Sequence, residues 1–152
     1  MSLFSALNNS ASALTANRFR MDVISSNVAN AQTTRARFVN GEWQPYQRKM
    51  VHIAPSGTKR FDSLLQKAMG KQDESSQGVK VTRIVEDQAP FKLVYDPDHP
   101  DANEEGYVSL PNVDIAKEMV DLMSATRSYD ANVTVLNATK SMFVKALEIG
   151  KG

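Results

Sequence analysis

The residues that interrupt helices are confined to the middle of this 152-residue chain. No glycine occurs before Gly41, none lies between Gly106 and Gly150, and all six prolines fall between Pro45 and Pro111, inclusive. Glycine and proline are the residues that most strongly disfavour a helix interior. The two ends of the chain can therefore form long helices, whereas the middle cannot.

The first predicted helix extends from about Leu3 to Asn30. Its apolar residues recur every seven positions, which places them on one helical face. They are Leu7, Leu14, Met21 and Val28. Asn30 can end the helix in a left-handed conformation. A helix of this extent is about 42 Å long.

The second predicted helix begins at Asn112, which follows Pro111 and can act as an N-cap, and ends near Ile149, before Gly150. An apolar stripe with a spacing close to 3.5 residues follows its length. The stripe comprises Ile115, Met119, Leu122, Thr126, Tyr129, Val133, Leu136, Phe143 and Leu147. At about 57 Å, this helix is longer than most helices of small domains.

The middle of the chain has the patterns of short strands. Residues 46–53 and 79–86 alternate between apolar and polar side chains, and residues 91–95 form a short apolar run. We expect 79–86 and 91–95 to pair as a hairpin. Residues 58–70 have helical spacing, and 71–78 form a polar linker. These patterns predict a small β-rich segment.

We therefore predict an α+β fold in which the two long terminal helices pack as an antiparallel, coiled-coil-like pair. The predicted divisions are residues 1–40 for the N-terminal helix and its following loop, 41–111 for the β-rich middle, and 112–152 for the C-terminal helix. Within the middle, Trp43 follows a turn and is expected to be a packing anchor.

Composition excludes several classes of function. The net charge of +1, from 18 basic and 17 acidic residues, gives little attraction to nucleic acid or anionic lipid. The absence of cysteine excludes disulfides and thiolate chemistry. No apolar run approaches the roughly 20 residues of a membrane-spanning helix, and the N-terminus lacks the pattern of a secretory signal. We expect no nucleic-acid partner and no direct membrane insertion.

An acidic stretch at residues 101–112 partly matches a calcium-binding EF-hand loop. Its twelfth position is Asn112, which cannot supply the closing bidentate carboxylate. We therefore expect a metal-free connection into the second helix, with Gly106 permitting the turn. A metal-binding or hydrolytic site centred on residues 96–101 is the weaker alternative, because no nucleophile elbow or phosphate-binding glycine loop accompanies it.

The polar faces of the predicted helices are unusually poor in charge. Up to Thr34, the charged side chains are Arg18, Arg20 and Asp22. A helix exposed to water usually carries more charge, and small neutral side chains suit a helix surrounded by other helices. We therefore favour assembly with neighbouring subunits over an isolated helical pair. A soluble adaptor that binds one partner helix without polymerising is the alternative.

Two segments resemble the terminal motifs of bacterial flagellar rod and hook proteins. Residues 25–38 resemble the N-terminal motif, Asn-apolar-Ala-Asn-x-x-Thr, at Asn27, Val28, Ala29, Asn30 and Thr33. Residues 127–151 resemble the C-terminal motif at Ala131, Asn132, Met142, Leu147 and Gly150. Residues 92–129 are similar to the proximal members of the rod family. Residues 34–38 lack the glycine-aromatic pair of many hook and distal-rod proteins, which also favours a proximal rod subunit.

The resemblance implies a structural subunit of the flagellar basal-body rod, with no enzymatic activity and no cofactor. Such subunits leave the cytoplasm through the flagellar type III export apparatus without a cleaved signal. Outside the cytoplasmic membrane they assemble helically with copies of themselves and with other rod proteins, and they transmit torque for motility. Their paired terminal helices form the inner tube, and their ends are expected to be largely disordered before assembly.

The predicted assembly interface combines the apolar stripes with asparagines of the two motifs. Its residues are Leu7, Leu14, Met21, Val28, Asn27, Asn30, Met119, Leu122, Tyr129, Asn132, Val133, Leu136, Phe143 and Leu147.

Overall fold

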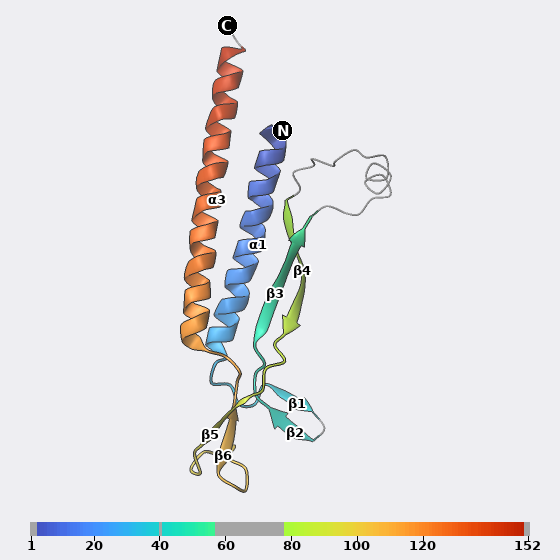
Figure 1. Cartoon of the computed structure of the whole chain (residues 1–152), viewed down its shortest axis with the longest axis vertical. Coiled ribbons are helices and arrows are strands. Elements are labelled where there is room, and N and C mark those ends of the chain that lie inside the picture. The colour runs from blue at the N-terminus through green and yellow to red at the C-terminus, as the bar shows by residue number, and fades with distance from the viewer. Residues whose placement is uncertain (1–2, 40, 57–77, 151–152) are drawn as a thin grey trace, which may run out of the picture.

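Two long helices lie side by side in opposite directions, with two-stranded hairpins along one side and at the lower end (Figure 1). The computed structural model describes residues 3–39, 41–56 and 78–150. The elements are α1 (Leu3–Ala29), β1 (Arg37–Val39), β2 (Glu42–Gln44), β3 (Lys49–Pro55), β4 (Val79–Glu86), β5 (Lys92–Tyr95), β6 (Tyr107–Leu110) and α3 (Ile115–Ile149). The predicted α+β class and the helical pair are confirmed. Neither of the described helices has an apolar stretch long enough to cross a membrane.

Helix α3 starts three residues later than predicted. Its N-cap is Asp114, whose side chain accepts hydrogen bonds from the backbone N–H groups of Ala116 and Lys117. Both Asn112 and Asp114 have the chemistry of an N-cap, but the Asn112 side chain is used elsewhere, as described below. The prediction that Asn112 caps this helix is therefore wrong.

One face of α3 is turned into the subunit from Glu118 to Phe143. Most of its partly or fully buried positions alternate in steps of three and four residues, as in a heptad seam. They are Glu118, Leu122, Ala125, Tyr129, Asn132, Leu136, Thr139 and Phe143. Ring contact between Phe4 and Phe143, with centroids 5.4 Å apart, closes the seam at the N-terminal end of α1.

The β3–β4 hairpin packs against α1 on the side away from α3 (Figure 1). The backbone N–H of Val79 donates a hydrogen bond to the Ser12 hydroxyl of α1 at 3.0 Å. Along the hairpin, half-buried valines alternate with the exposed residues His52, Lys80 and Arg83. This alternation is typical of a sheet with one packed and one exposed face.

The predicted hairpin between residues 79–86 and 91–95 is wrong. Strand β4 instead pairs with β3 over seven registered positions, and β5 pairs with β6. The segment between β4 and β5 does not form a tight turn, because Asp87 donates its backbone N–H to the Arg48 carbonyl at 2.8 Å. Strand β6 lies within the acidic stretch that was expected to be a loop. The predicted helix at 58–70 and nearly all of the linker lie outside the described residues.

Gly106, which was expected to permit a turn in the connection into the second helix, lies at the end of the loop between the paired strands β5 and β6. Its φ of 82° is in the left-handed region, which favours glycine. A Cβ atom added at this position would lie 2.9 Å from Cε2 of Tyr95. Conformation and close packing therefore both require glycine here.

Replacing Gly106 by alanine should lower the free energy of unfolding by about 2 kcal/mol, because the new methyl group adds a steric conflict to the backbone strain. Gly41→Ala is the matched control, since φ at Gly41 is 91° but nothing lies within 4 Å of an added Cβ. We expect it to cost about 1 kcal/mol. Urea unfolding followed by circular dichroism compares the two, and equal losses would contradict a role for the Tyr95 contact.

Candidate functional site

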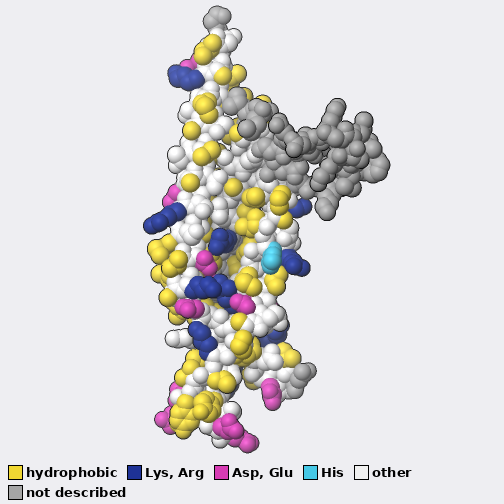
Figure 2. All heavy atoms as spheres, viewed as in Figure 1, with side chains coloured by type: hydrophobic (Ala, Val, Ile, Leu, Met, Phe, Trp, Pro, Cys, Tyr) yellow, Lys and Arg dark blue, Asp and Glu magenta, His cyan; other side chains and the backbone are white. Residues whose placement is uncertain are grey.

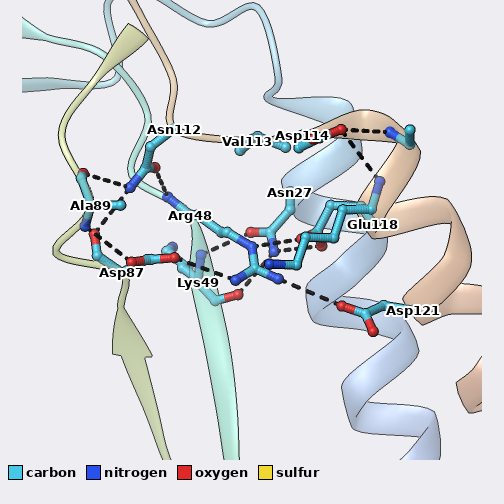
Figure 3. A network of polar contacts seen from close by, with 12 residues as sticks. Asn27, Arg48, Lys49, Asp87, Ala89, Asn112, Val113, Asp114, Glu118 and Asp121 are labelled. Atoms are coloured by element: carbon cyan, nitrogen blue, oxygen red, sulfur yellow. Dashed lines mark hydrogen bonds and ion pairs between the residues drawn. The ribbon is translucent and has the colours of Figure 1, made fainter.

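A cluster of polar side chains connects α1, the start of β3 and α3 at the lower end of the helical pair (Figure 3). We call this cluster the polar junction; it consists of Asn27, Arg48, Asp87, Glu118 and Asp121. Asn27 is 1% exposed and Glu118 is 0% exposed. Charged side chains are rarely buried to this degree without a partner. The junction must therefore satisfy its own hydrogen bonds and charges.

Asn27 makes all four hydrogen bonds that a carboxamide can make. Its Nδ2 donates to the Lys49 carbonyl at 2.9 Å and to Oε2 of Glu118 at 3.0 Å. Its Oδ1 accepts from the Lys49 N–H at 2.9 Å and from the Tyr46 hydroxyl at 3.0 Å. Asn27 thus bonds both the N–H and the carbonyl of Lys49, as the backbone of a paired strand would. Aspartate at this position could not donate either bond.

Arg48 contacts three carboxylates with one guanidinium group. Its Nε donates to Oε1 of Glu118 at 2.6 Å, and its Nη1 donates to Oδ2 of Asp87 at 3.3 Å. Its Nη2 lies 3.6 Å from Oδ2 of Asp121. Burial by itself would lower the pKa of Arg48, but the hydrogen bonds and negative charges of Glu118 and Asp87 outweigh burial and raise this pKa. Arg48 therefore stays charged, and it compensates the buried charge of Glu118.

Asn112 attaches the segment before α3 to the hairpins. Its Oδ1 accepts from the backbone N–H of Arg48 at 2.8 Å. Its Nδ2 donates to the carbonyls of Asp87 and Ala89, at 3.1 and 3.0 Å. These contacts explain why Asn112 is not the cap of α3. They also place Arg48 and Asp87 side by side within the polar junction.

A second polar contact attaches the loop after α1 to the β5–β6 hairpin. Asp101 accepts hydrogen bonds from the Thr34 hydroxyl at 2.7 Å and from Nε of Arg35 at 2.6 Å. The hydrogen bond from Arg35, followed by that from Thr34, lowers the pKa of Asp101 below its usual value. A lowered pKa means that this contact stabilises the fold at neutral pH and is lost as the pH falls through the folded-state pKa.

The acidic stretch uses its polar groups within the fold. His99 accepts the backbone N–H of Asp101 at 3.1 Å through Nδ1, and Asn103 accepts the N–H groups of Glu105 and Tyr107 through Oδ1. Within residues 3–39, 41–56 and 78–150, no three acidic or histidine side chains are grouped as metal ligands.

The residues predicted for the assembly interface differ in how far they are buried. Asn27 lies inside the polar junction, and Asn30 donates its side-chain amide to the Ser26 carbonyl at 2.9 Å. Several others are half-buried; they are Leu7, Leu14, Met21, Val28, Leu122, Tyr129, Asn132, Val133, Leu136 and Phe143. Met119 and Leu147 are on the surface, 48% and 60% exposed.

The described part of the chain exposes far more large apolar side chains than it buries. Seven hydrophobic residues are buried, whereas nineteen large ones are exposed. Nine of the exposed residues lie on α3, and Figure 2 shows such side chains along this helix. They are Ile115, Met119, Val120, Met123, Val135, Met142, Val144, Leu147 and Ile149. Seven of the nine were absent from the predicted interface. Ile115 belongs to the predicted 3.5-residue stripe, and the other six could have been found as apolar residues that lie off it.

Comparison with known protein families matches both ends of the chain. Residues 7–37 match the flagella basal body rod protein family, and residues 104–149 match the flagellar basal body rod FlgEFG protein C-terminal family. These two segments meet at the polar junction, because the first contains Asn27 and the second contains Glu118.

Several curated relatives are similar to this chain over its full length. It is 62% identical to the flagellar basal-body rod protein FlgC of Bacillus subtilis, over 99% of this chain and 100% of the relative. It is 43% identical to FlgC of Borreliella burgdorferi over 100% of both chains. It is 42% identical to FlgC of Salmonella typhimurium over 99% of this chain and 100% of the relative.

Replacing Arg48 by methionine should lower the free energy of unfolding by about 3–5 kcal/mol, because it leaves a buried carboxylate without its cation. The double variant Arg48→Met/Glu118→Gln should recover part of this loss. Arg20→Met is the control, since Arg20 is 39% exposed and pairs with Asp121 at 3.4 Å; it should cost less than about 1 kcal/mol. Chemical unfolding measures all three, and similar losses for Arg48→Met and Arg20→Met would contradict the role of the junction.

Proposed function

This chain belongs to the flagellar basal-body rod protein family, and we propose that it joins the rod by packing the outer faces of its terminal helices against neighbouring subunits. It is a structural subunit of the flagellar basal body. We further propose that it belongs to the proximal rod, where its neighbours are copies of itself and other rod proteins. Its role there is mechanical rather than catalytic.

The exposed apolar side chains of α3 carry this proposal. Burying a large apolar side chain stabilises it by about 1.5–3 kcal/mol relative to full exposure. Val120, Met123, Val135 and Met142 are each 51–60% exposed, so covering them with a neighbour releases a substantial part of that free energy. An apolar surface of this extent is typical of an interaction site rather than of a free monomer.

The exposed face of α1 is suited to the same use. Its positions recur in steps of three and four residues and carry mostly small or neutral side chains. They include Phe4, Asn8, Ala11, Thr15, Arg18, Asp22, Ser25 and Ala29. Small side chains at most of these positions allow another helix to approach closely.

The C-terminal end of α3 supports an additional contact. Beyond the ring contact at Phe143, the helix continues to Ile149 and projects past α1 (Figure 1). Leu147 and Ile149 in this projection are 60% and 83% exposed. We propose that a neighbouring subunit covers this projection, which otherwise has little reason to remain helical.

We also propose that the subunit is exported by the flagellar type III apparatus and gains its full order on assembly. Ordering a chain segment costs conformational entropy that burial must offset. Five of the eight buried side chains of the described helices lie in the half that contains the polar junction; they are Val23, Ile24, Asn27, Glu118 and Ala125. Ends that are weakly held in the free subunit suit export, and their packing in the rod suits transmission of torque.

Replacing Val135 by aspartate should abolish incorporation into basal bodies and swimming in soft agar, while export and helix content stay unchanged. Val135 is 51% exposed, so a charge there disturbs a neighbour rather than the subunit itself. Leu136→Asp should instead disrupt the helical pair, because the adjacent Leu136 is half-buried in the seam. Val135→Ala is the control and should be tolerated. Normal swimming of Val135→Asp would contradict the proposed interface.

A further inference from the structure

The charges of this chain are divided unevenly between its lower end and the rest. We call residues 31–48 and 87–114 the base; these two segments contain four basic and eight acidic residues, a net charge of −4. The whole chain carries +1, so the remainder carries +5. Because opposite charges attract, this division draws the acidic base of one copy towards the basic remainder of another.

Exposed aromatic side chains are gathered at the base. Phe38 and Trp43 on the β1–β2 hairpin are 59% and 55% exposed, and Tyr95 and Tyr107 on the β5–β6 hairpin are 64% and 41% exposed. Within each pair the rings meet edge to face, with centroids 5.2 and 5.3 Å apart. Trp43, which was expected to be a packing anchor, packs against Phe38 but leaves 55% of its surface exposed. A depression of about 370 Å³ lies between Trp43 and Tyr107, and we call it the aromatic groove.

The charged side chains that line the aromatic groove are Glu42 and the paired Asp101 and Arg35. Further acidic residues, Asp96, Asp98, Glu104 and Glu105, lie outside the groove, close in sequence to the two tyrosines, and are all exposed. Figure 2 shows acidic side chains around a group of apolar ones at the lower end of the molecule. Exposed aromatic rings beside carboxylates fit a partner that presents cations, since a guanidinium or ammonium group interacts with both. Aromatic side chains are also common at the centres of protein interfaces.

The outer face of the β3–β4 hairpin presents such cations. His52 lies directly opposite Arg83 in the register, and Ala54 lies opposite Lys80. Paired residues share one face of a sheet, and His52, Lys80 and Arg83 are all exposed. A register shift between His52 and Ile53, which leaves Thr82 without a registered partner, brings Lys80 and Arg83 onto the same face. Met50, Ala54 and Val85 share this face by register, and none of these residues is acidic. Within the described residues, Lys80 and Arg83 form no ion pair.

We propose that the aromatic groove of one copy binds the basic outer face of the β3–β4 hairpin of the next copy. The guanidinium of Arg83 then lies against the aromatic rings, and Lys80 lies near the surrounding carboxylates. The two surfaces are different parts of one chain, so each contact leaves a groove free at one end and a basic face free at the other. A contact of this kind continues as an open helical array. The inference rests on the proposed function and adds a contact that is independent of the terminal helices.

A charge exchange tests the proposal in cells. Glu104→Lys/Glu105→Lys and Lys80→Glu/Arg83→Glu each place like charges across the contact, so each should lower the amount of subunit in purified basal bodies by about tenfold. The chain that carries all four substitutions restores opposite charges and should recover incorporation to near the wild-type amount. Recovery supports the pairing of these two surfaces. Normal incorporation of either reversed chain, or no recovery in the combined chain, would overturn it.

Cross-linking supplies a second measurement. The chain has no cysteine, so a full-length chain with Asp98→Cys and Lys80→Cys can be treated with a short bis-maleimide in intact basal bodies. Dimers and larger multimers should form, whereas each single-cysteine chain should form neither. If basal bodies that contain the double-cysteine subunit give no multimers, the groove contact is overturned, but the proposed helix packing is not. Incorporation of Val135→Asp would instead overturn the proposed helix packing, so the two failures are distinguishable.

Discussion

The ion pair between Arg48 and the fully buried Glu118 determines how the two ends of this chain meet. A carboxylate without water around it is tolerated only when a cation and hydrogen-bond donors surround it. Arg48 at the start of the β3–β4 hairpin provides the cation, and Asn27 near the end of α1 provides the donor. The three residues come from three distant parts of the sequence, so their contacts form only when both helices and the hairpin are docked. The junction therefore specifies one arrangement of the helices, a use for which buried polar groups are well suited.

Outside the polar junction, the described part of the chain has a small interior, which agrees with the proposed assembly. Only a few side chains of the described helices are fully buried, and the buried residues include Asn27, Glu118 and Thr139 as well as apolar ones. A domain stabilised in this way holds its helices in register without covering their outer faces. Those outer faces supply free energy when neighbours cover them. This combination agrees with the proposed export and assembly, because an exported chain has to pass through a channel before it joins the rod.

The helices were predictable from the sequence because glycine and proline are excluded from long terminal segments. The strand partners could not be predicted, because the alternation of residues 79–86 is compatible with pairing to β3 or to residues 91–95. Which partner is chosen depends on the packing of α1 and on Asn112. Asn112 and Asp114 are equally good caps in sequence, and only the tertiary contacts of Asn112 with Arg48 and Asp87 distinguish them. Asn27 belonged to a recognised motif, but its partners lie 22 and 91 residues away. The heptad stripe of α3 revealed an apolar face without revealing that a second apolar face points outward.

Amide hydrogen exchange of the purified subunit, compared with the subunit in basal bodies, tests this account most directly. The account predicts slow exchange of the free subunit near the junction, in residues 20–27, 48–50 and 115–125, and fast exchange at the opposite helix ends, in residues 4–10 and 140–149. In basal bodies, all of these segments should exchange slowly. Uniform slow exchange along both helices of the free subunit would contradict the account, because the helix ends would then be stable without neighbours.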